Sequence, residues 1–405
     1  MGDKSAFVGI VTKLFDITGK ALSGEWGTDD PDGCGIPVLR TTNFTNVGKV
    51  NYDNVVTRNI QKKNISDKLL KKGDIIIEKS GGTDKNPVGR VIYFEGEENK
   101  YLFNNFTGLL RVKDKNEWYP KYVFYSMFAY YKRGGTRRFE NKTTGLHNLK
   151  LDDYIKRLDI QKASYVDQVH VFKLLDCVRL QIDNMERELE LLDKLVKARF
   201  VEMFGDPEDN PFKWDKMPLS NIMLNANNGM ARRGNDENGN IVLRLVELQD
   251  GYINYSNPNR ICLNENEKKR YLLKNNDFLF ARVNGNPDNV GRCAVFHDIG
   301  EDVYHNDHII RVHFNEELLN GVFASELINS NFGKRQLKKR IKTSAGQYTV
   351  SQDGIGAIVS IVPPLELQNQ FASFVKEIDK SRSRIQKSLE ASQELFDSLM
   401  KEYFC

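Results

Sequence analysis

Two runs of basic side chains are the part of this chain best suited to bind an anion. Between Tyr130 and Lys150 the one acidic residue is Glu140, and between Leu327 and Gln352 there is none. The basic residues of the two runs are Lys132, Arg133, Arg137, Arg138, Lys142 and Lys150, and Lys334, Arg335, Lys338, Lys339, Arg340 and Lys342. Lys and Arg bind nucleic-acid phosphates and release condensed counterions, which makes the affinity salt-dependent. A solvated helix face would have the same composition, but the recurrence of the run 202 residues later favours two phosphate-binding surfaces.

Two glycine-rich segments, each following a strand-like stretch, form a second pair. Glu78-Lys79-Ser80-Gly81-Gly82 precedes Gly89-Arg90, and Ala281-Arg282-Val283-Asn284-Gly285 precedes Gly291-Arg292. Glycine lets the backbone approach another surface closely, and Arg and Asn can hydrogen-bond bidentately to guanine and adenine edges. Ordinary β-hairpin turns would also explain the glycines. The predicted DNA contacts here are Lys79, Ser80, Arg90, Arg282, Asn284 and Arg292, with Arg232 and Arg233 as further candidates in a stretch that could also be a mobile surface loop.

Residues that would carry catalysis are harder to find. His297, His305, His308 and His313 have no carboxylate or cysteine at metal-ligand spacing, which favours surface or core histidines. Glu98-Asn99-Lys100 and Glu267-Lys268-Lys269 have the E-x-K form of metal-dependent nucleases but fall in hydrophilic turns. The sequence has no phosphate-binding G-x-x-x-x-G-K-[ST] loop, no G-x-G-x-x-G that opens a helix and no N-P-P-Y-type methyltransferase motif. We therefore expect a DNA reader without a catalytic or metal site of its own.

The elements that must position these residues are duplicated along the chain. Glu190-Leu191-Leu192-Asp193-Lys194-Leu195-Val196-Lys197 returns 204 residues later as Glu394-Leu395-Phe396-Asp397-Ser398-Leu399-Met400-Lys401. Leu39-Arg40 matches Leu243-Arg244 at the same offset, and Gly89-Arg90 matches Gly291-Arg292 at 202. This period is too long for a solenoid repeat, so each copy should be a domain of its own.

A long helix is predicted at the end of each copy. The first should begin at the Ser164 cap, with Asp167 three residues on, and stop at Gly205. The second should open at Pro363-Pro364, where a missing N–H costs little. The apolar seam positions, spaced alternately by three and four, include Leu175, Val178, Ile182, Met185, Leu189, Leu192 and Val196, and Phe374, Ile378, Ile385, Leu395 and Leu399.

Helices of roughly 40 residues would be about 60 Å long, too long to be covered by one small domain. The economical arrangement is an antiparallel coiled coil of the two helices, and the alternative is that each lies on its own domain. The intervening stretches carry short apolar runs, such as Ile75-Ile76-Ile77 and Phe278-Leu279-Phe280, bounded by Gly, Asn and Pro. These runs predict strands, so the expected fold class is mixed α/β.

Composition narrows the class of protein. The chain of 405 residues is 40% hydrophobic and 28% charged, which suits two or three globular domains. The formal charge of +4 alone does not imply nucleic acid. The five cysteines form no C-x-x-C pair, which fits reduced thiols in a cytoplasm. No apolar signal segment and no run of about 18 apolar residues occurs, so no membrane association is expected.

The order of these features resembles the specificity subunit of Type I restriction-modification systems. Gly346-Gln347-Tyr348-Thr349-Val350 leads through Ile358-Val359-Ser360-Ile361 to Pro363-Pro364-Leu365-Glu366, as at the close of a target recognition domain in that family. The first copy keeps Gly145-Leu146-His147-Asn148-Leu149, and Phe200 to Pro207 looks like the family's central junction. The resemblance implies target recognition domains at 1–162 and 206–362 and conserved helices at 163–205 and 363–405, and it adds Gln347 to the expected DNA contacts.

The resemblance also implies partners. Such a subunit is non-catalytic, reads an asymmetric bipartite site in double-stranded DNA and docks two modification subunits together with restriction subunits. S-adenosylmethionine, ATP and Mg²⁺ are then expected on the partners and no cofactor in this chain. A methyltransferase or nuclease acting alone, and a coiled-coil scaffold for other proteins, remain the alternatives.

Overall fold

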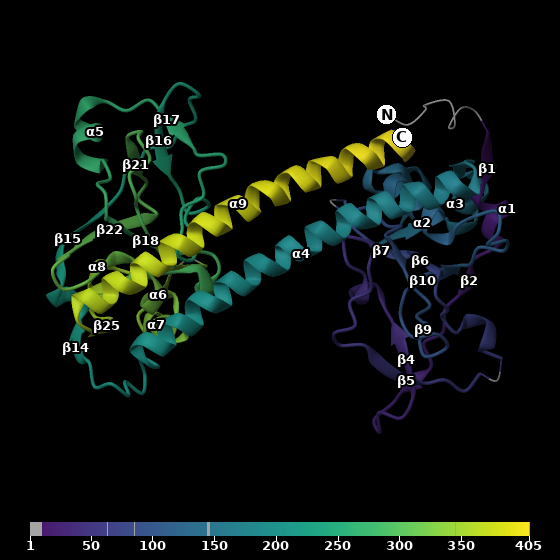
Figure 1. The fold of residues 1–405 in the computed structure, drawn as a ribbon, viewed down its shortest axis with the longest axis horizontal. Coiled ribbons are helices and arrows are strands. Elements are labelled where there is room, and N and C mark those ends of the chain that lie inside the picture. The colour runs from purple at the N-terminus through teal and green to yellow at the C-terminus, as the bar shows by residue number, and fades with distance from the viewer. Residues whose placement is uncertain (1–9, 63, 85, 144–145, 345, 405) are drawn as a thin grey trace. The chain divides into compact units, whose positions relative to one another are not determined.

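Each half of the chain ends in a helix of 40 residues, α4 (Tyr165–Phe204) and α9 (Leu365–Phe404), drawn in teal and yellow in Figure 1. The computed structural model describes residues 10–404 except 63, 85, 144, 145 and 345. By its contacts the chain divides into unit 1, residues 1–185 with 388–405, and unit 2, residues 186–387. Both long helices are therefore shared between the units. In the described part of the chain, no helix is long and apolar enough to cross a membrane.

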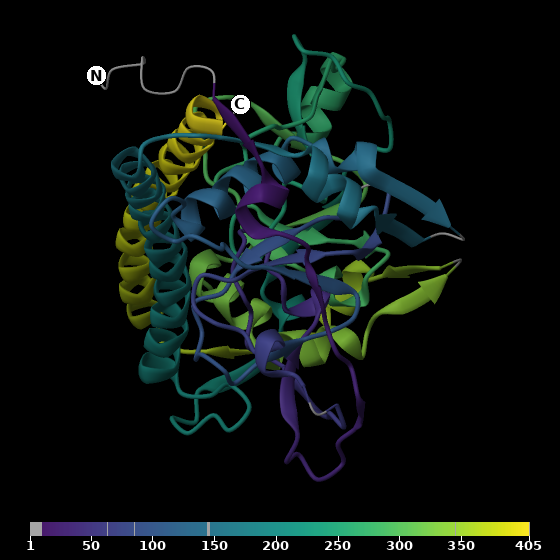
Figure 2. The same cartoon turned by 90° about the vertical axis from the view of Figure 1, so that its right-hand side faces the viewer.

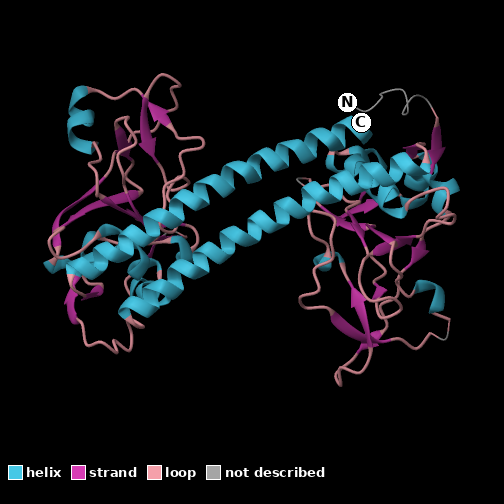
Figure 3. Cartoon of the chain, viewed as in Figure 1, coloured by secondary structure: helices cyan, strands magenta, loops and turns pink. Residues whose placement is uncertain are grey.

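Unit 1 is a mixed α/β domain (Figure 3). One antiparallel sheet has the order β2-β10-β6-β8, with strands Leu22–Ser23, Thr107–Leu110, Ile75–Glu78 and Val91–Tyr93. A second has the order β3-β5-β4-β9, with strands Thr28–Asp29, Val56–Asn59, Ile36–Leu39 and Leu102–Phe103. Strand β1 (Val11–Lys13) pairs with β13 (Asp159–Gln161). The helices besides α4 are α1 (Leu14–Thr18), α2 (Pro120–Lys132) and α3 (Leu151–Arg157).

Unit 2 repeats this topology. Its antiparallel sheet β15-β22-β18-β20 contains Met223–Asn228, Ile309–Phe314, Phe278–Ala281 and Cys293–Val295. A further sheet, β17-β16-β21, contains Arg260–Ile261, Asn240–Leu243 and Val303–His305, and β14 (Asp215–Pro218) pairs with β25 (Val359–Val362). The shorter helices are α5 (Glu265–Tyr271), α6 (Gly321–Asn329), α7 (Asn331–Lys338) and α8 (Gln352–Gly356). The predicted strands and the mixed α/β class are thus confirmed in both copies.

The central strand of each unit is buried on both faces. Side chains alternate across a strand, so Ile75 and Ile77 join the core beneath α2 while Ile76 joins the core on the other face. In unit 2, Phe278 and Phe280 pack toward α6 in the same way. This explains why both strands are continuous apolar runs in the sequence.

The ends of the long helices follow the sequence signals. The Ser164 hydroxyl accepts the backbone N–H of Asp167 at 3.2 Å, and Gly205 ends α4 with a positive φ of 76°. Within unit 1, Leu175, Val178 and Ile182 of α4 share a core with the last turns of α9. Within unit 2, Val196 near the end of α4 shares a core with Phe371 at the start of α9. In each unit, therefore, the beginning of one long helix packs with the end of the other.

One seam residue was predicted wrongly. Leu395 is 49% exposed, whereas its neighbour Phe396 is 4% exposed and packs in the core of unit 1 with Met400 and Phe404. The remaining seam residues are buried or half-buried, namely Leu175, Val178, Ile182, Met185, Leu189, Leu192, Val196, Phe374, Ile378, Ile385 and Leu399. The error arises because Leu395 and Phe396 are adjacent apolar residues on neighbouring faces of a helix, and spacing alone chose the wrong one.

The structural register of the two helices also differs from the sequence match. Phe404 contacts Tyr122 of α2 at 5.3 Å between ring centroids, and Phe204 contacts Phe323 of α6 at 4.7 Å, so Phe204 and Phe404 are equivalent. The helix repeat is therefore 200 residues, not the 204 of the sequence match. Four residues are close to one helical turn, so a match displaced by one turn preserves the apolar pattern.

A buried glutamine joins the first turn of each long helix to its unit. Gln168 accepts the backbone N–H of Tyr119 and donates to the carbonyls of Glu117 and Ala163. Gln368 accepts the backbone N–H of Asn320 and donates to the carbonyls of Leu318 and Pro363. Both side chains are fully buried. They connect each long helix to the segment that leads into α2 or α6.

Candidate nucleic-acid interface

The glycine-rich segment and the basic run meet in one small sheet in unit 1. Strand β7 (Ser80–Gly82) pairs with β12 (Leu146–Leu149), which forms a hairpin with β11 (Glu140–Thr143). Ser80 lies opposite Asn148, and Lys142 lies opposite His147. The sequence placed these residues in separate motifs, and strand pairing brings them together.

Unit 2 contains the same small sheet. Strand β19 (Val283–Asn284) pairs with β24 (Gln347–Thr349), which forms a hairpin with β23 (Lys342–Ser344). Asn284 lies opposite Tyr348, and Lys342 lies opposite Thr349. In Figure 2 the β11–β12 hairpin (blue) and the β23–β24 hairpin (yellow-green) each extend outward from the body of their own unit. We call each three-stranded sheet the hairpin sheet of its unit.

Internal contacts hold the hairpin sheet of unit 1 in place. The His147 side chain is buried, and its Nδ1 lies 2.9 Å from Oε2 of Glu140. The other carboxylate oxygen of Glu140 accepts the backbone N–H of Val88 at 3.0 Å. Because two buried polar side chains hold it to the loop before β8, this hairpin is positioned by more than its own turn.

The basic residues closest to this sheet in sequence remain available. Arg137 and Arg138 are exposed and lie on the 3₁₀ helix Gly135–Phe139 that leads into β11. Arg137 donates to the carbonyl of Asp84 at 3.0 Å, while Arg138 stacks over Phe139 at 4.9 Å. Neither forms an ion pair with a carboxylate among the described residues. Lys142 lies on β11, but its side chain is outside the described part of the structure.

Lys79 is half-buried at the entrance to the same sheet. Its Nζ donates to the Ser23 hydroxyl at 3.1 Å. Burial lowers the pKa of Lys79, and the positive charge of Lys68 lowers it further. A nearby anion would counter both effects, because its negative charge favours the protonated form of Lys79.

Several predicted contact residues instead bind within their own unit. Arg90 pairs with Glu78 at 3.1 Å and donates to the carbonyls of Phe44 and Thr41. Arg133 donates to the carbonyl of Phe404 at the end of α9. Both guanidinium groups therefore already bind acceptors within their own unit in this conformation. Their contact with DNA stays a prediction.

In unit 2, half of the basic run lies on α7, and its charge is partly neutralised. Lys334 pairs with Asp250 and Lys338 with Asp288, both at 2.8 Å, while Arg335 pairs with Glu208. Arg340 donates to the carbonyls of Gln336 and Ala357. Lys339, Lys342 and Gln347 are exposed, and for the first two no ion pair is found in the described part of the chain. The two runs match in sequence but differ in how much charge they leave for a ligand.

The other arginines of unit 2 are also engaged. Arg292 lies 2.9 Å from Asp250 and donates to Gln249 and Asn289. Arg282 donates to the carbonyl of Asp307, whose carboxylate pairs with Arg233 at 2.6 Å. Arg232 pairs with Glu267, which raises the pKa of the guanidinium. The Asn284 side chain accepts the backbone N–H of Asn286 and so shapes the loop after β19.

Sequence reasoning did not single out Asn148 and Tyr348, which lie beside Ser80 and Asn284 in the two hairpin sheets. The signal was available in the strand-like residues after Gly145 and Gly346, but the pairing partners lay more than 60 residues away. Within the described residues, no group of three His, Cys, Asp or Glu side chains is placed to hold a metal ion. His305, one of the clustered histidines, is fully buried.

Solved structures share this fold over nearly the whole chain. The S subunit of a Type I restriction-modification system from M. genitalium superposes with a TM-score of 0.61 at 16% identity, covering 98% of this chain and 96% of that one. A structure from work on complex assembly and conformational transition of the Type I system gives 0.51 at 11% identity, covering 98% and 97%. The fold is thus that of Type I specificity subunits.

Curated sequences agree with the fold. The StySPI specificity subunit of Salmonella potsdam is 24% identical over 393 residues, covering 91% of this chain and 81% of its own length. The EcoKI specificity subunit of Escherichia coli K12 is 22% identical over 397 residues, covering 91% and 82%. No family model matches the chain. In fold and over most of its sequence, the chain is thus similar to Type I restriction enzyme specificity subunits.

Proposed function

We propose that this chain is the DNA-reading subunit of a Type I restriction-modification complex and that each unit reads one half of a bipartite site. The observation that carries the proposal is the hairpin sheet, which occurs once in each unit with polar and basic residues on or beside it. Hairpins and exposed Lys and Arg side chains suit groove and phosphate contacts. The similar curated proteins and solved structures are specificity subunits, which supports the same role.

The half-sites should differ from each other. Ser80 and Asn148 lie side by side in unit 1, where unit 2 has Asn284 and Tyr348. Exposed charge differs as well, because three of the basic residues of α7 are paired with carboxylates. Different side chains at equivalent positions of two similar readers give an asymmetric target.

We infer further that α4 and α9 form one antiparallel coiled coil between two target recognition domains. This arrangement is supported by the packing within each unit, where the beginning of one helix lies against the end of the other. The coiled coil would set the spacing of the half-sites and would dock the modification subunits, expected to be two, and the restriction subunits. The chain itself would be non-catalytic, and S-adenosylmethionine, ATP and Mg²⁺ would bind to the partners.

The test combines the chain with a Type I modification subunit and maps adenine methylation on random-sequence DNA. We expect two unlike half-sites separated by an unread spacer. Removing one heptad from the middle of each long helix should shorten the spacer by about three base pairs, since seven residues span about 10 Å. An unchanged spacer would refute the role of the helices, and sequence-independent binding would refute the reading function.

A further inference from the structure

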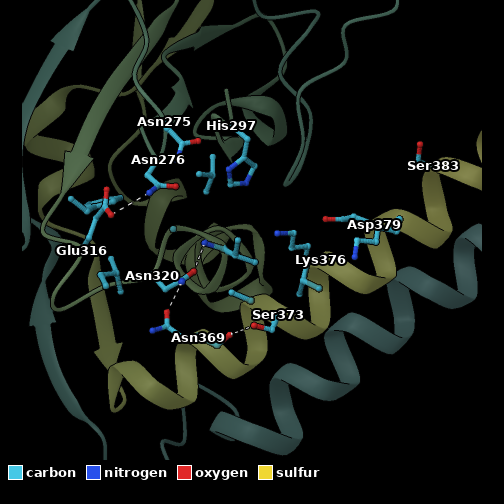
Figure 4. A pocket seen from close by; sticks show the side chains of 18 of the residues that line it. Asn275, Asn276, His297, Glu316, Asn320, Asn369, Ser373, Lys376, Asp379 and Ser383 are labelled. Atoms are coloured by element: carbon cyan, nitrogen blue, oxygen red, sulfur yellow. Dashed lines mark hydrogen bonds between the residues drawn. The ribbon is translucent and has the colours of Figure 1, made fainter. Parts of the chain in front are cut away.

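A groove with a volume of about 1170 Å³ runs beside the first turns of α9 within unit 2. Its apolar lining includes Val295, Phe314, Leu319, Val322, Ala372 and Val375. Figure 4 shows His297, Asn275 and Asn276 on one side of the cavity, with Lys376 and Asp379 of α9 on the other. The groove is therefore an apolar trough with a polar rim.

Unit 1 shows what fills the equivalent place. The matching hydrogen bonds of Gln168 and Gln368 make Tyr119 equivalent to Asn320 and Phe172 equivalent to Ala372. In unit 1 the rings of Tyr119 and Phe172 stack with centroids 4.1 Å apart and planes within 3°. Unit 2 has neither ring, and both Asn320 and Ala372 line the groove. The space that two aromatic rings fill in unit 1 is therefore left open in unit 2.

The charge at the rim is reversed between the copies. In unit 1, Lys121 lies between Glu95 and Asp176, at 2.6 and 2.7 Å. The equivalent of Asp176 in unit 2 is Lys376, and that of Lys121 is Val322. The lysine of unit 1 has carboxylate partners inside its own unit, whereas the lysine of unit 2 forms no ion pair with any described residue.

The other titratable groups at the rim do not neutralise Lys376. Asp379 pairs with Arg382, and Lys380 pairs with Glu377, each at 2.7 Å along α9 itself. Glu316 accepts a hydrogen bond from the neighbouring Asn276 side chain on the side of the groove opposite Lys376 (Figure 4). Arg384, one turn beyond Lys380, also lacks an ion pair among the described residues. Burial lowers the pKa of His297, which disfavours a positive charge on its imidazole.

We propose that this groove binds a segment of a partner protein that presents a large aromatic side chain flanked by carboxylates. The ring would fill the volume that Tyr119 and Phe172 occupy in unit 1. The carboxylates would pair with Lys376 and Arg384, supplying the negative charge that Asp176 supplies in unit 1. This interaction is independent of DNA reading, and it predicts an asymmetry in which only unit 2 accepts such a segment.

The test uses the full chain and a fluorescein-labelled acetylated peptide with a central phenylalanine flanked on each side by two aspartates, titrated by fluorescence anisotropy. We expect saturable binding, weakened when alanine replaces the phenylalanine or when lysines replace the aspartates. Ala372→Phe, which places the ring of Phe172 in the groove, should weaken binding at least about tenfold, a loss of about 1.4 kcal/mol. Lys376→Glu, at an exposed position, should also weaken it.

The matched control is Ala391→Phe, the same substitution at an exposed position of α9 outside the groove. It should leave peptide affinity unchanged, and thermal unfolding of each variant checks that it folds. If Ala372→Phe proves unstable, Lys376→Glu alone decides the question. The proposal fails if the wild-type chain shows no saturable binding, if both groove variants bind as wild type does, or if the lysine peptide binds equally well.

Discussion

Gln368 makes the same three hydrogen bonds at the start of α9 that Gln168 makes at the start of α4. Each side-chain oxygen accepts a backbone N–H, at 2.9 and 2.8 Å respectively, and each amide nitrogen donates to two carbonyls. The two positions are 200 residues apart, as are the ends of the two helices. The pair thus fixes the structural register of the duplication and the way each long helix leaves its unit.

Removing the hydrogen bonds of the Gln168 side chain should destabilise unit 1. Gln168→Leu keeps most of the side-chain volume but leaves a buried N–H and two carbonyls without their partner, at a cost of about 3 kcal/mol. The free energy of urea-induced unfolding measures the loss. Gln181→Leu, on an exposed face of the same helix, should change it by less than about 0.5 kcal/mol. Equal effects of the two substitutions would show that the hydrogen bonds of Gln168 contribute nothing to the free energy of unfolding.

The seam assignment near the end of α9 can be tested on two adjacent residues. Phe396→Ala should cost about 3–5 kcal/mol because it leaves a cavity in the core of unit 1. Leu395→Ala should cost less than about 1 kcal/mol because that side chain is half exposed. Chemical denaturation of both variants gives the comparison. A larger loss for Leu395→Ala would show that Leu395, and not Phe396, contributes the buried side chain at this turn of α9.

DNA binding should depend on the arginines before the hairpin sheet of unit 1. Replacing Arg137 and Arg138 together by glutamine should reduce the slope of log affinity against log salt concentration by about 1.8, or about 0.9 per lost phosphate contact. Mobility-shift titrations at several salt concentrations measure the slope. Lys194→Gln with Lys197→Gln, on an exposed face of α4, removes the same charge as a control and should leave it unchanged. An unaltered slope in the arginine variant would exclude both residues from the phosphate contacts.

Acid should destabilise unit 2 through His305. Burial lowers the pKa of this histidine to about 4, with a smaller contribution from Arg311, against an ordinary value near 6.5. The unfolded chain therefore binds more protons between these values, and the stabilisation is complete above about pH 6.5 and is lost as the pH falls toward 4. The loss should reach about 3 kcal/mol at pH 4.

Urea unfolding at pH 7 and pH 4 tests this linkage. The difference in unfolding free energy should be smaller for His305→Gln than for wild type. His170→Gln, at an exposed position, should behave like wild type. The same pH dependence in all three proteins would show that His305 does not carry it.

Local signals in the sequence predicted much of the fold because they act over a few residues. The cap at Ser164, the left-handed Gly205 and the apolar strand Ile75-Ile76-Ile77 are all found where their patterns indicated. The DNA contacts stay predictions, and the structure adds internal partners that the sequence did not indicate. Arg90 and Arg292 have the residue type that reads guanine, yet both are engaged by acceptors that are distant in sequence. No local sequence pattern links an arginine to an acceptor that is distant in the chain. The sequence therefore could not distinguish an arginine that binds within its own unit from one that is free to contact a base.

The sequence by itself determined the duplication, the two long helices and the resemblance to Type I specificity subunits, because repeats, periodicity and caps depend on the order of the residues. The tertiary structure alone decided which residues the duplication makes equivalent. A displacement of one helical turn leaves the apolar pattern intact, so only the contacts of Phe204, Phe404 and the two glutamines fix the repeat at 200. It also decided that the glycine-rich segments and the basic hairpins form one sheet in each unit, because strand pairing joins residues that are far apart along the chain.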